Sequence, residues 1–501
     1  MKKRIIALAL VLVMLITALC ACTTGNTDNG KDSETQNSEE TTGNSNGSVT
    51  DSQTTKEPSY YETPDDLGTM NLGKTINLLC WEAEQPEFEI EGQTGDSVTD
   101  AIYFKNQAVE ARLGVTLNFE MTPGNFANRK AFIEKVESGK SNKDYDIVAC
   151  YSMTSSSLAL KGLSEDLLSL DYLNFDKPWW PDSLVSQATI NDKLYFASGD
   201  ISTNLLHMMY ATFFNKTMFE EFDELKDIDP YKLVTGKKWT VDRMTQLCSK
   251  VSGTTSTGEI KGLSIRDLNY DAFYTSCGLK TIEKADDKLV ISEDFKPSSQ
   301  KTIQLIDKLV NFVSGKYVLA VGSGSSAQPF AENRALFTID RSYLPIVSKN
   351  MIEAGDSIVF GVIPCPMYDT KQDNYVTVVG FPYTMYQITS YSNIKNESSA
   401  VLECLAAEGF RRVTPALFEK TMKVKNTSDK NTAEMYDIIK STVYFDLGRI
   451  FAMNFSEWTY KIFRDCLATA NNSFSSSYGS NSITIQKALD EEINPYFFGS
   501  K

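Results

Sequence analysis

The side chains of this chain that could do chemistry are carboxylates and aromatic rings at the ends of apolar runs. Glu82 and Glu84 follow an apolar run that ends at Trp81. Asp340 and Arg341 follow a second such run. A close pair of carboxylates could act as acid and nucleophile on a glycosidic bond, whereas separate carboxylates could bind the hydroxyls of a captured molecule. The residues therefore leave an enzyme and a binding protein open.

The chain lacks the residue patterns of other common catalytic and metal-binding sites. The one histidine, His207, stands in an apolar stretch, which favours a structural role. The chain has no HExxH helix, no GxSxG elbow and no histidine cluster, and the glycine-rich stretch 321–326 lacks the lysine of a phosphate-binding loop. We therefore expect no cofactor and no metal site.

The cysteines form neither a metal-site pattern nor a disulfide scaffold. Those after residue 22 are odd in number and far apart, and no two are spaced as CxxC. We expect small apolar core residues, with one long-range disulfide left open. They are Cys80, Cys150, Cys248, Cys277, Cys365, Cys404 and Cys466.

The N-terminus has the features of a bacterial export signal. A basic start precedes an apolar run over 5–19, which is shorter than the roughly 20 residues of a membrane-spanning helix. The tetrapeptide LCAC at 19–22 resembles the lipobox, at which the signal is cut before the cysteine and its thiol is acylated. The sequence predicts a signal peptide over 1–21 and a lipidated Cys22, with ordinary secretion as the alternative.

A polar spacer follows the predicted lipidation site. Residues 23–70 are rich in Thr, Ser, Asn and Gly and carry ten acidic residues against Lys31 and Lys56. Such a stretch cannot bury enough apolar surface to offset its ordering entropy. We predict a disordered acidic tether over 22–71.

Net charge and length limit the possible partners of the chain and the number of its domains. The formal charge of −16 becomes −19 once the three basic residues of the signal are removed. This acidity argues against nucleic acid and against an anionic membrane surface as partners, so any membrane contact is through the lipid anchor only. About 430 residues after the tether suffice for two domains.

The first 80 residues of this body alternate between strand and helix patterns with short connections. Such an order predicts right-handed crossovers and a parallel sheet, whose ligands bind at the carboxyl ends of the strands. Thr99 is the expected N-cap of the first helix and Gly114 its end. The predicted strands are 74–81, 115–120 and 145–150, and the helices are 100–113 and 126–138.

Short motifs in a fixed order run through the body. Two of these motifs lack a glycine where one is expected. Asp192 stands at the hairpin turn of the motif at 190–195, and Glu332-Asn333 precede the alanine of the motif at 332–337. The motifs are YDIV at 145–148, LKGLSEDL at 160–167, PWW at 178–180, INDKLY at 190–195, FNK at 214–216, DPYKLV at 229–234, GKKWTVD at 236–242, ENRALF at 332–337, FGVIPCP at 360–366 and QDNY at 372–375.

These motifs resemble the extracellular solute-binding proteins of bacterial ABC transporters, family 1 type, in the sugar-binding lipoprotein branch. The resemblance implies a type II periplasmic-binding-protein-like α/β fold, with two lobes, a ligand cleft between them and a helix-rich C-terminal third. It places lobe 1 at 72–200 plus 376–428 and lobe 2 at 201–375 plus 429–501.

The resemblance also implies a function without catalysis. A monomer on the extracellular face of the cell membrane would capture a carbohydrate, expected to be an oligosaccharide, and deliver it to ABC permease subunits. The predicted helices at 400–412, 416–422, 433–441 and 457–470 replace the regular strand–helix repeats of a hydrolase barrel, which favours the binding protein over a lipid-anchored glycoside hydrolase.

Sugar binding asks for aromatic faces against C–H surfaces and for planar polar groups against hydroxyls. Residues of these types stand at predicted strand ends and crossing segments. The aromatic candidates are Trp81, Tyr151, Trp180, Tyr343 and Tyr383, and the polar candidates are Glu82, Glu84, Asp200, Asp340 and Arg341.

Overall fold

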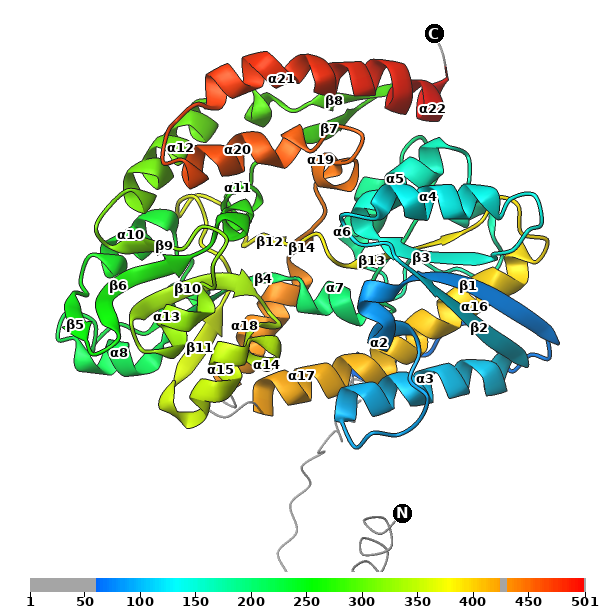
Figure 1. Ribbon diagram of the computed structural model, residues 1–501, viewed down its shortest axis with the longest axis horizontal. Coiled ribbons are helices and arrows are strands. Elements are labelled where there is room, and N and C mark those ends of the chain that lie inside the picture. The colour runs from blue at the N-terminus through cyan, green and yellow to red at the C-terminus, as the bar shows by residue number, and fades with distance from the viewer. Residues whose placement is uncertain (1–59, 424–429, 500–501) are drawn as a thin grey trace, which may run out of the picture. The chain divides into compact units, whose positions relative to one another are not determined.

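The structure is a computed structural model that describes residues 60–423 and 430–499 (Figure 1). The predicted signal peptide, Cys22 and the tether up to residue 59 lie outside the described residues. In the described part of the chain, no helix is both long enough and apolar enough to cross a bilayer.

The first sheet has the strand order β13-β3-β1-β2. β1 (Lys74–Trp81) pairs in parallel with β2 (Val115–Thr122) and with β3 (Ile147–Tyr151), as the alternating pattern predicts. β13 (Thr384–Ile388) comes from much later in the chain and pairs antiparallel with β3. The carboxyl ends of β1 and β3 therefore lie at one edge, next to the start of β13.

Helix α3 (Ser97–Leu113) connects β1 to β2 and starts earlier than predicted. Asp96, rather than Thr99, is its N-cap, because the Asp96 carboxylate accepts hydrogen bonds from the amides of Val98 and Thr99. Gly114 ends the helix with a φ of 62°, the left-handed conformation that favours glycine, as predicted.

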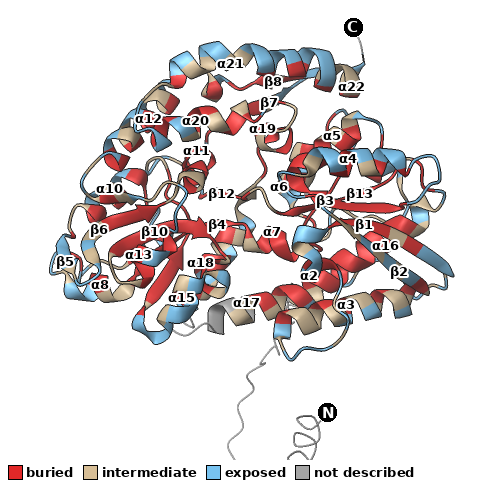
Figure 2. Cartoon of the chain, in the orientation of Figure 1, coloured by how far each residue is buried: buried red, intermediate tan, exposed pale blue. Residues whose placement is uncertain are grey.

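The second sheet has the order β11-β4-β10-β6-β5, with β9 beside β6. Its central strand β10 pairs antiparallel with β4 and parallel with β6. Figure 2 shows buried residues along the strands of both sheets. The strands are β4 (Tyr210–Asn215), β5 (Gly253–Thr255), β6 (Gly258–Ile265), β9 (Val318–Ala320), β10 (Ala335–Arg341) and β11 (Phe360–Ile363).

The chain passes between the two sheets more than once. Helix α7 (Thr203–His207) leads into β4, and β12 (Thr377–Val378) leads back to β13 in the first sheet. β12 pairs in parallel with β14 (Val443–Tyr444), so a late segment joins the same crossing region (Figure 1). A separate hairpin is formed by β7 (Ile282–Ala285) and β8 (Lys288–Ile291).

The C-terminal third is helical, as predicted. α16 and α17 pack along α3, and α20 packs against α12 and α21. These helices are α16 (Lys395–Glu408), α17 (Thr414–Lys423), α18 (Lys430–Ser441), α19 (Leu447–Ile450), α20 (Trp458–Ala468), α21 (Phe474–Ala488) and α22 (Asn494–Phe498), with π-helical turns at Gly409–Val413 and Leu489–Ile493.

Shorter helices connect the strands. Those of the first half are α2 (Gln85–Phe88), α4 (Arg129–Ser138), α5 (Ser152–Leu160), α6 (Asp182–Ala188), α8 (Lys216–Glu221), α9 (Pro230–Thr235) and α10 (Val241–Cys248). Those that follow are α11 (Asp271–Ser276), α12 (Gln300–Val313), α13 (Ala327–Ala331), α14 (Leu344–Val347) and α15 (Lys349–Ala354). 3-10 turns lie at Tyr60–Glu62, Glu82–Glu84, Leu167–Ser169, Asp267–Tyr270, Glu293–Phe295 and Gly355–Ser357.

The end of the predicted tether is part of the folded body, so the prediction that the spacer extends to residue 71 is wrong for its last residues. Leu67 is buried in the core. Asp65 forms ion pairs with Arg112 and, at 2.8 Å, with Arg411. Burial opposes ionisation of Asp65, but the two guanidiniums outweigh it and lower the pKa of that carboxyl. These long-range contacts supply what the local composition lacks.

The seven cysteines from Cys80 to Cys466 are free and buried, and no disulfide links them. The prediction of apolar core residues is confirmed for these seven.

Candidate functional site

The ends of the strands meet at residues 379–383, the segment that enters β13. The Ser152 amide, which follows β3, donates to the Tyr383 carbonyl at 2.9 Å, and the Ser152 hydroxyl donates to the Phe381 carbonyl. The Gly380 amide donates to the carbonyl of Met208, just after α7. This segment therefore joins the carboxyl edge of the first sheet to the crossing region.

Trp81 and Tyr151 form the aromatic base of this edge. The Trp81 side chain is only 1% exposed, and its Nε1 donates to Thr384 Oγ1 at 2.9 Å. Its ring centroid lies 5.4 Å from that of Tyr151. Tyr383, also buried, packs its ring 6.0 Å from Phe445. Because the Trp81 side chain is enclosed, its ring packs against Tyr151 and offers no open face to a ligand.

Two arginines lie against a second aromatic pair. The rings of Phe381 and Tyr460 are 4.8 Å apart, the Arg449 guanidinium lies 3.9 Å from the Phe381 centroid, and Arg464 lies 4.5 Å from that of Tyr460. Phe381 is partly exposed. Stacked guanidiniums hold these rings in place and add a cation–π term.

Asp271, at the start of α11, binds both arginines. Its Oδ1 accepts from Arg464 Nε at 2.7 Å, and its Oδ2 accepts from Arg449 Nη1 at 2.9 Å and from Arg464 Nη2 at 2.5 Å. Burial opposes ionisation of Asp271, yet Arg464 and Arg449 outweigh it and lower the pKa of the carboxyl. The two arginines therefore favour the ionised form of Asp271, which does not suit a general acid.

The predicted residues Asp340 and Arg341 lie at the end of β10. Asp340 accepts hydrogen bonds from the Ser326 hydroxyl at 3.1 Å and from the Arg341 amide at 2.8 Å. The Arg341 guanidinium lies 5.6 Å from the ring of Tyr210 and 5.9 Å from the ring of Tyr343. An ideal Cβ on Gly380 would lie 2.8 Å from Arg341 Nε, so the glycine leaves room for the guanidinium.

These contacts bring together a group that we call the strand-end cluster. Its rings and charges come from both sheets, from the crossing segment and from the C-terminal helices. The strand-end cluster consists of Tyr151, Asp271, Arg341, Phe381, Arg449, Tyr460 and Arg464.

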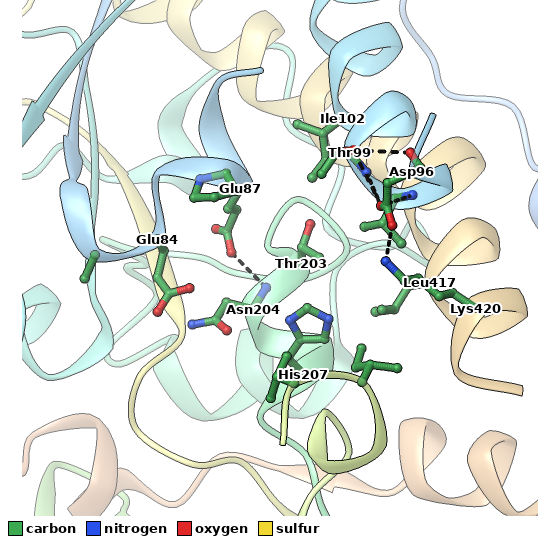
Figure 3. A pocket seen from close by; sticks show the side chains of 15 residues that line it. Glu84, Glu87, Asp96, Thr99, Ile102, Thr203, Asn204, His207, Leu417 and Lys420 are labelled. Carbon is green, nitrogen blue, oxygen red and sulfur yellow. Dashed lines mark hydrogen bonds and ion pairs between the residues drawn. The ribbon is translucent and has the colours of Figure 1, made fainter. Parts of the chain in front are cut away.

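A hollow of about 290 Å³ lies beside α7. The Tyr343 amide donates to the His207 carbonyl, which links this hollow to Arg341 through Tyr343. Figure 3 shows Glu84, Asn204 and His207 on one side and the Asp96–Lys420 ion pair on the other. The hollow is lined by Ala83, Glu84, Pro86, Glu87, Asp96, Val98, Thr99, Ile102, Thr203, Asn204, His207, Ile346, Val347, Leu417 and Lys420.

Burial makes two titratable groups of the hollow neutral near pH 7. Burial and the neighbouring Glu87 raise the pKa of Glu84 to about 8. Burial and Lys420 lower the pKa of His207 to about 4, and its Nε2 has no hydrogen-bond partner among the described residues. A protonated carboxyl and a neutral imidazole can bind hydroxyl groups without an ion pair.

Trp180 and Asp200 lie apart from the strand-end cluster. The Trp180 and Trp179 indoles donate to the two oxygens of Glu403 at 2.9 and 3.0 Å. Asp200 pairs with Lys440 at 2.9 Å and accepts from Thr414. We call Trp179, Trp180 and Glu403 the tryptophan–glutamate group.

Trp180 and Asp200 line a different hollow, on the face of α7 that carries Leu205 and Leu206. The structure thus does not bring these two residues together with Trp81 and Tyr151. Glu82 is exposed after β1, outside the hollow that Glu84 lines. Ligand roles for Trp180, Asp200 and Glu82 stay predictions.

Sequence patterns missed the part of the strand-end cluster that comes from the last third of the chain. Arg449, Tyr460 and Arg464 follow no strand. The available signals were weak: Tyr460 and Arg464 are four residues apart, on one face of α20, and Phe381 lies five residues after the predicted return to lobe 1 at residue 376. In the described residues, no group of three or more His, Cys, Asp or Glu side chains could hold a metal ion.

Comparison with solved structures identifies the fold. The GacH receptor of Streptomyces glaucescens, solved unliganded and with acarbose, aligns with a TM-score of 0.54 and 12% identity over 84% of this chain and 100% of its own. A cyclo/maltodextrin-binding protein with maltotetraose aligns with a TM-score of 0.55 and 13% identity over 85% and 99%.

An ABC transporter solute-binding protein from Thermotoga lettingae, bound with α-D-tagatose, aligns with a TM-score of 0.51 and 15% identity over 83% and 100%. The scan of protein-family models and the search of curated proteins give no match. The chain therefore has the two-lobed type II periplasmic-binding fold, and the predicted fold class is confirmed.

Proposed function

We propose that this chain is the solute-binding protein of an ABC import system and that it captures a carbohydrate at the strand-end cluster. The observation that carries the proposal is the Phe381–Tyr460 ring pair, held by Arg449 and Arg464 beside the carboxyl edge of the first sheet. The sugar-bound proteins of the same fold support it.

The side chains of the site suit sugar rings. The partly exposed face of Phe381 can pack on the C–H surface of a sugar ring, and guanidiniums can donate two parallel hydrogen bonds to neighbouring oxygens. The hollow beside α7 adds neutral polar groups, Glu84 and His207, that can bind hydroxyls. Rings and planar donors on one surface are the combination that a carbohydrate requires.

A binding role fits the carboxylates better than hydrolysis does. Of the carboxylates near the rings, Asp271 is bound by two arginines, and Asp340 is buried and bonded to Ser326. Glu457 accepts from the Tyr460 hydroxyl and is paired with Arg129 and Lys461. None of the three is placed as a free acid beside a second free carboxylate, which a glycoside hydrolase requires.

Export, lipid anchoring and delivery to a permease complete the proposal. They rest on the export signal and the lipobox-like LCAC at 19–22, and on the resemblance of the motifs to solute-binding lipoproteins. We propose a monomer at the extracellular face of the cell membrane, anchored through Cys22, with an oligosaccharide as its cargo.

Titration calorimetry of Phe381→Ala tests the site. Removing the ring should weaken binding of whichever oligosaccharide the wild type binds by about 1.5–3 kcal/mol, roughly 10-fold to 150-fold, because a large aromatic contact is lost. The matched control is Tyr317→Ala, which removes a partly buried ring beside β9 and should leave affinity unchanged.

Two outcomes would contradict this assignment. Unchanged affinity of Phe381→Ala would remove the strand-end cluster from the site. Release of reducing ends from the bound oligosaccharide by the wild-type chain would show a hydrolase instead.

A further inference from the structure

Arg341 is a buried guanidinium with few partners. The residue is only 8% exposed, at the end of β10. Its Nη1 donates to the Tyr343 hydroxyl at 3.3 Å, which is a long hydrogen bond, and its Nε has no partner among the described residues. A guanidinium carries five N–H donors, so most of its hydrogen-bonding capacity is unused here.

The neighbouring carboxylate of Asp340 does not satisfy the remaining N–H donors of Arg341. Asp340 Oδ1 approaches Arg341 Nη1 only to 4.0 Å, and this oxygen accepts from the Arg341 amide instead. The other oxygen, Oδ2, accepts from Ser326. The rings of Tyr210 and Tyr343 offer the cation a favourable face, but the Tyr343 hydroxyl is their one acceptor that bonds the guanidinium among the described residues. Burying a charge with unmade hydrogen bonds costs stability, and a ligand that makes those bonds recovers it.

The surroundings of Tyr151 are positive as well. Burial raises the pKa of Tyr151, while Arg449, Arg129 and Arg341 act in the opposite direction and Glu457 is the carboxylate that adds to the rise. Arg449 and Arg464 share the single carboxylate of Asp271. Of the three guanidiniums that act on Tyr151, Arg129 is paired with Glu457 at 2.8 Å and Arg449 with Asp271 at 2.9 Å. Arg341, whose Asp340 oxygen lies 4.0 Å away, is the one of the three without a close ion pair among the described residues.

We propose that the captured carbohydrate is acidic and that Arg341 binds its carboxylate, so the ligand class is an oligosaccharide that contains uronic acid. A guanidinium matches a carboxylate in shape and can donate two parallel hydrogen bonds to it. The rings of the strand-end cluster bind the sugar faces, and Arg341 selects the acid. This inference rests on the proposed function.

Paired ligands that differ only at the acid test the inference in the full-length chain. The panel contains oligomers of galacturonate, mannuronate and glucuronate-containing repeats, their carboxyl-reduced neutral counterparts, and oligosaccharides without uronic acid that carry a sulfate ester. Thermal shift ranks the panel, and calorimetry measures the affinities. We expect a uronate oligomer to bind about 30-fold or more tighter than its carboxyl-reduced counterpart, as for a buried charge pair that loses one partner.

Variants at one strand separate recognition from folding. Arg341→Gln should lose about 30-fold or more in affinity for the acid and little for the neutral counterpart, and Arg341→Lys should fall between, because lysine keeps the charge without the fork. Arg334→Gln removes a guanidinium that precedes the other end of β10 and pairs with Glu332, so it should change neither affinity. Thermal melting checks the fold of each variant, and the wild-type panel stands even where Arg341→Gln does not fold.

Each outcome of these experiments supports or overturns a stated part of the inference. Preference for neutral sugars, or equal loss of both affinities in Arg341→Gln, overturns the acidic ligand and leaves carbohydrate binding intact. Binding of sulfated sugars in preference to uronates overturns the carboxylate and keeps the anion. No stabilisation by any member of the panel overturns both this inference and the proposed function.

Discussion

The strand-end cluster and the tryptophan–glutamate group use similar side chains, rings beside charges, and differ in how their polar atoms are bonded. In the tryptophan–glutamate group both Glu403 oxygens accept indole N–H groups, and both rings are buried. In the strand-end cluster Arg341 keeps an unpaired Nε, and Phe381 is partly exposed. Complete pairing indicates a structural group, whereas unused donors beside an accessible ring indicate a surface prepared for a ligand.

The difference also explains why Trp180 and Arg341 look alike as candidates in the sequence. Each is a large side chain near charged residues. Only the contacts show that the Trp180 indole is satisfied by Glu403, 223 residues later in the chain.

The largest expected effect comes from Trp180→Ala. It should lower the free energy of unfolding by about 3–5 kcal/mol, because it leaves a cavity and removes the donor to Glu403 Oε2. Urea denaturation measures the loss. Trp180→Phe, which keeps a ring without the N–H, should lose less. Oligosaccharide affinity of the folded fraction should stay unchanged, and weaker binding at full stability would place Trp180 in the ligand site and break the comparison.

A pH effect of about 3 kcal/mol is expected from Glu403. Burial raises the pKa of Glu403 to about 7, although Trp180, the Asn174 amide and Trp179 lower it. The folded state therefore holds this proton more tightly than the unfolded state, whose pKa is about 4.3. The stabilisation is complete below about pH 4.3 and is lost as the pH rises through about 7.

Glu403→Gln should remove that part of the pH dependence. Urea denaturation of the wild type and the variant between pH 4 and 8 measures the two slopes. Glu434→Gln, which removes an exposed carboxyl, controls for the change of net charge. Equal slopes for wild type and Glu403→Gln would mean that folding does not raise the pKa of Glu403.

The smallest effect is expected at Asp65, a fully paired carboxylate outside both groups. Asp65→Asn should cost about 1–2 kcal/mol of unfolding free energy, because it weakens the bonds to Arg112 and Arg411. Asp66→Asn, at an exposed pair with Lys177, should cost clearly less than Asp65→Asn, because water screens the pair. Both variants should keep wild-type sugar affinity, and loss of affinity in Asp65→Asn would mean that pairing does not separate structural groups from the ligand site.

Much of the first sheet could be predicted from local patterns. β1 covers the predicted residues 74–81, and its parallel pairing follows from the strand–helix–strand order. The departure at Asp192 is harmless, because Asn191 and Asp192 both adopt positive φ in a tight turn closed by the Ile190–Lys193 pair. The cap of α3 was placed wrongly because Asp96, Ser97 and Thr99 can all cap, and only the first helical turn shows which one does.

The candidate site was predicted in part. Tyr151 was found because parallel strands end at a common edge, and Arg341 was found because it follows an apolar run, and local sequence can show both. Arg449 and Arg464 were missed because their contact with Asp271 joins residues 178 and 193 positions apart. No spacing in the sequence encodes such a pair.

The sequence by itself determined the acidity, the order of the strands and helices of the first sheet and the positions of its strand ends, and it carries the prediction of an export signal. These properties follow from residue types and from the periods of helix and strand, which act over a few residues. The tertiary structure alone decided which rings are enclosed, which carboxylates are bonded and that Arg341 keeps unused donors. Those facts depend on which distant segments meet, because a buried polar atom is satisfied by whatever partner the fold brings to it.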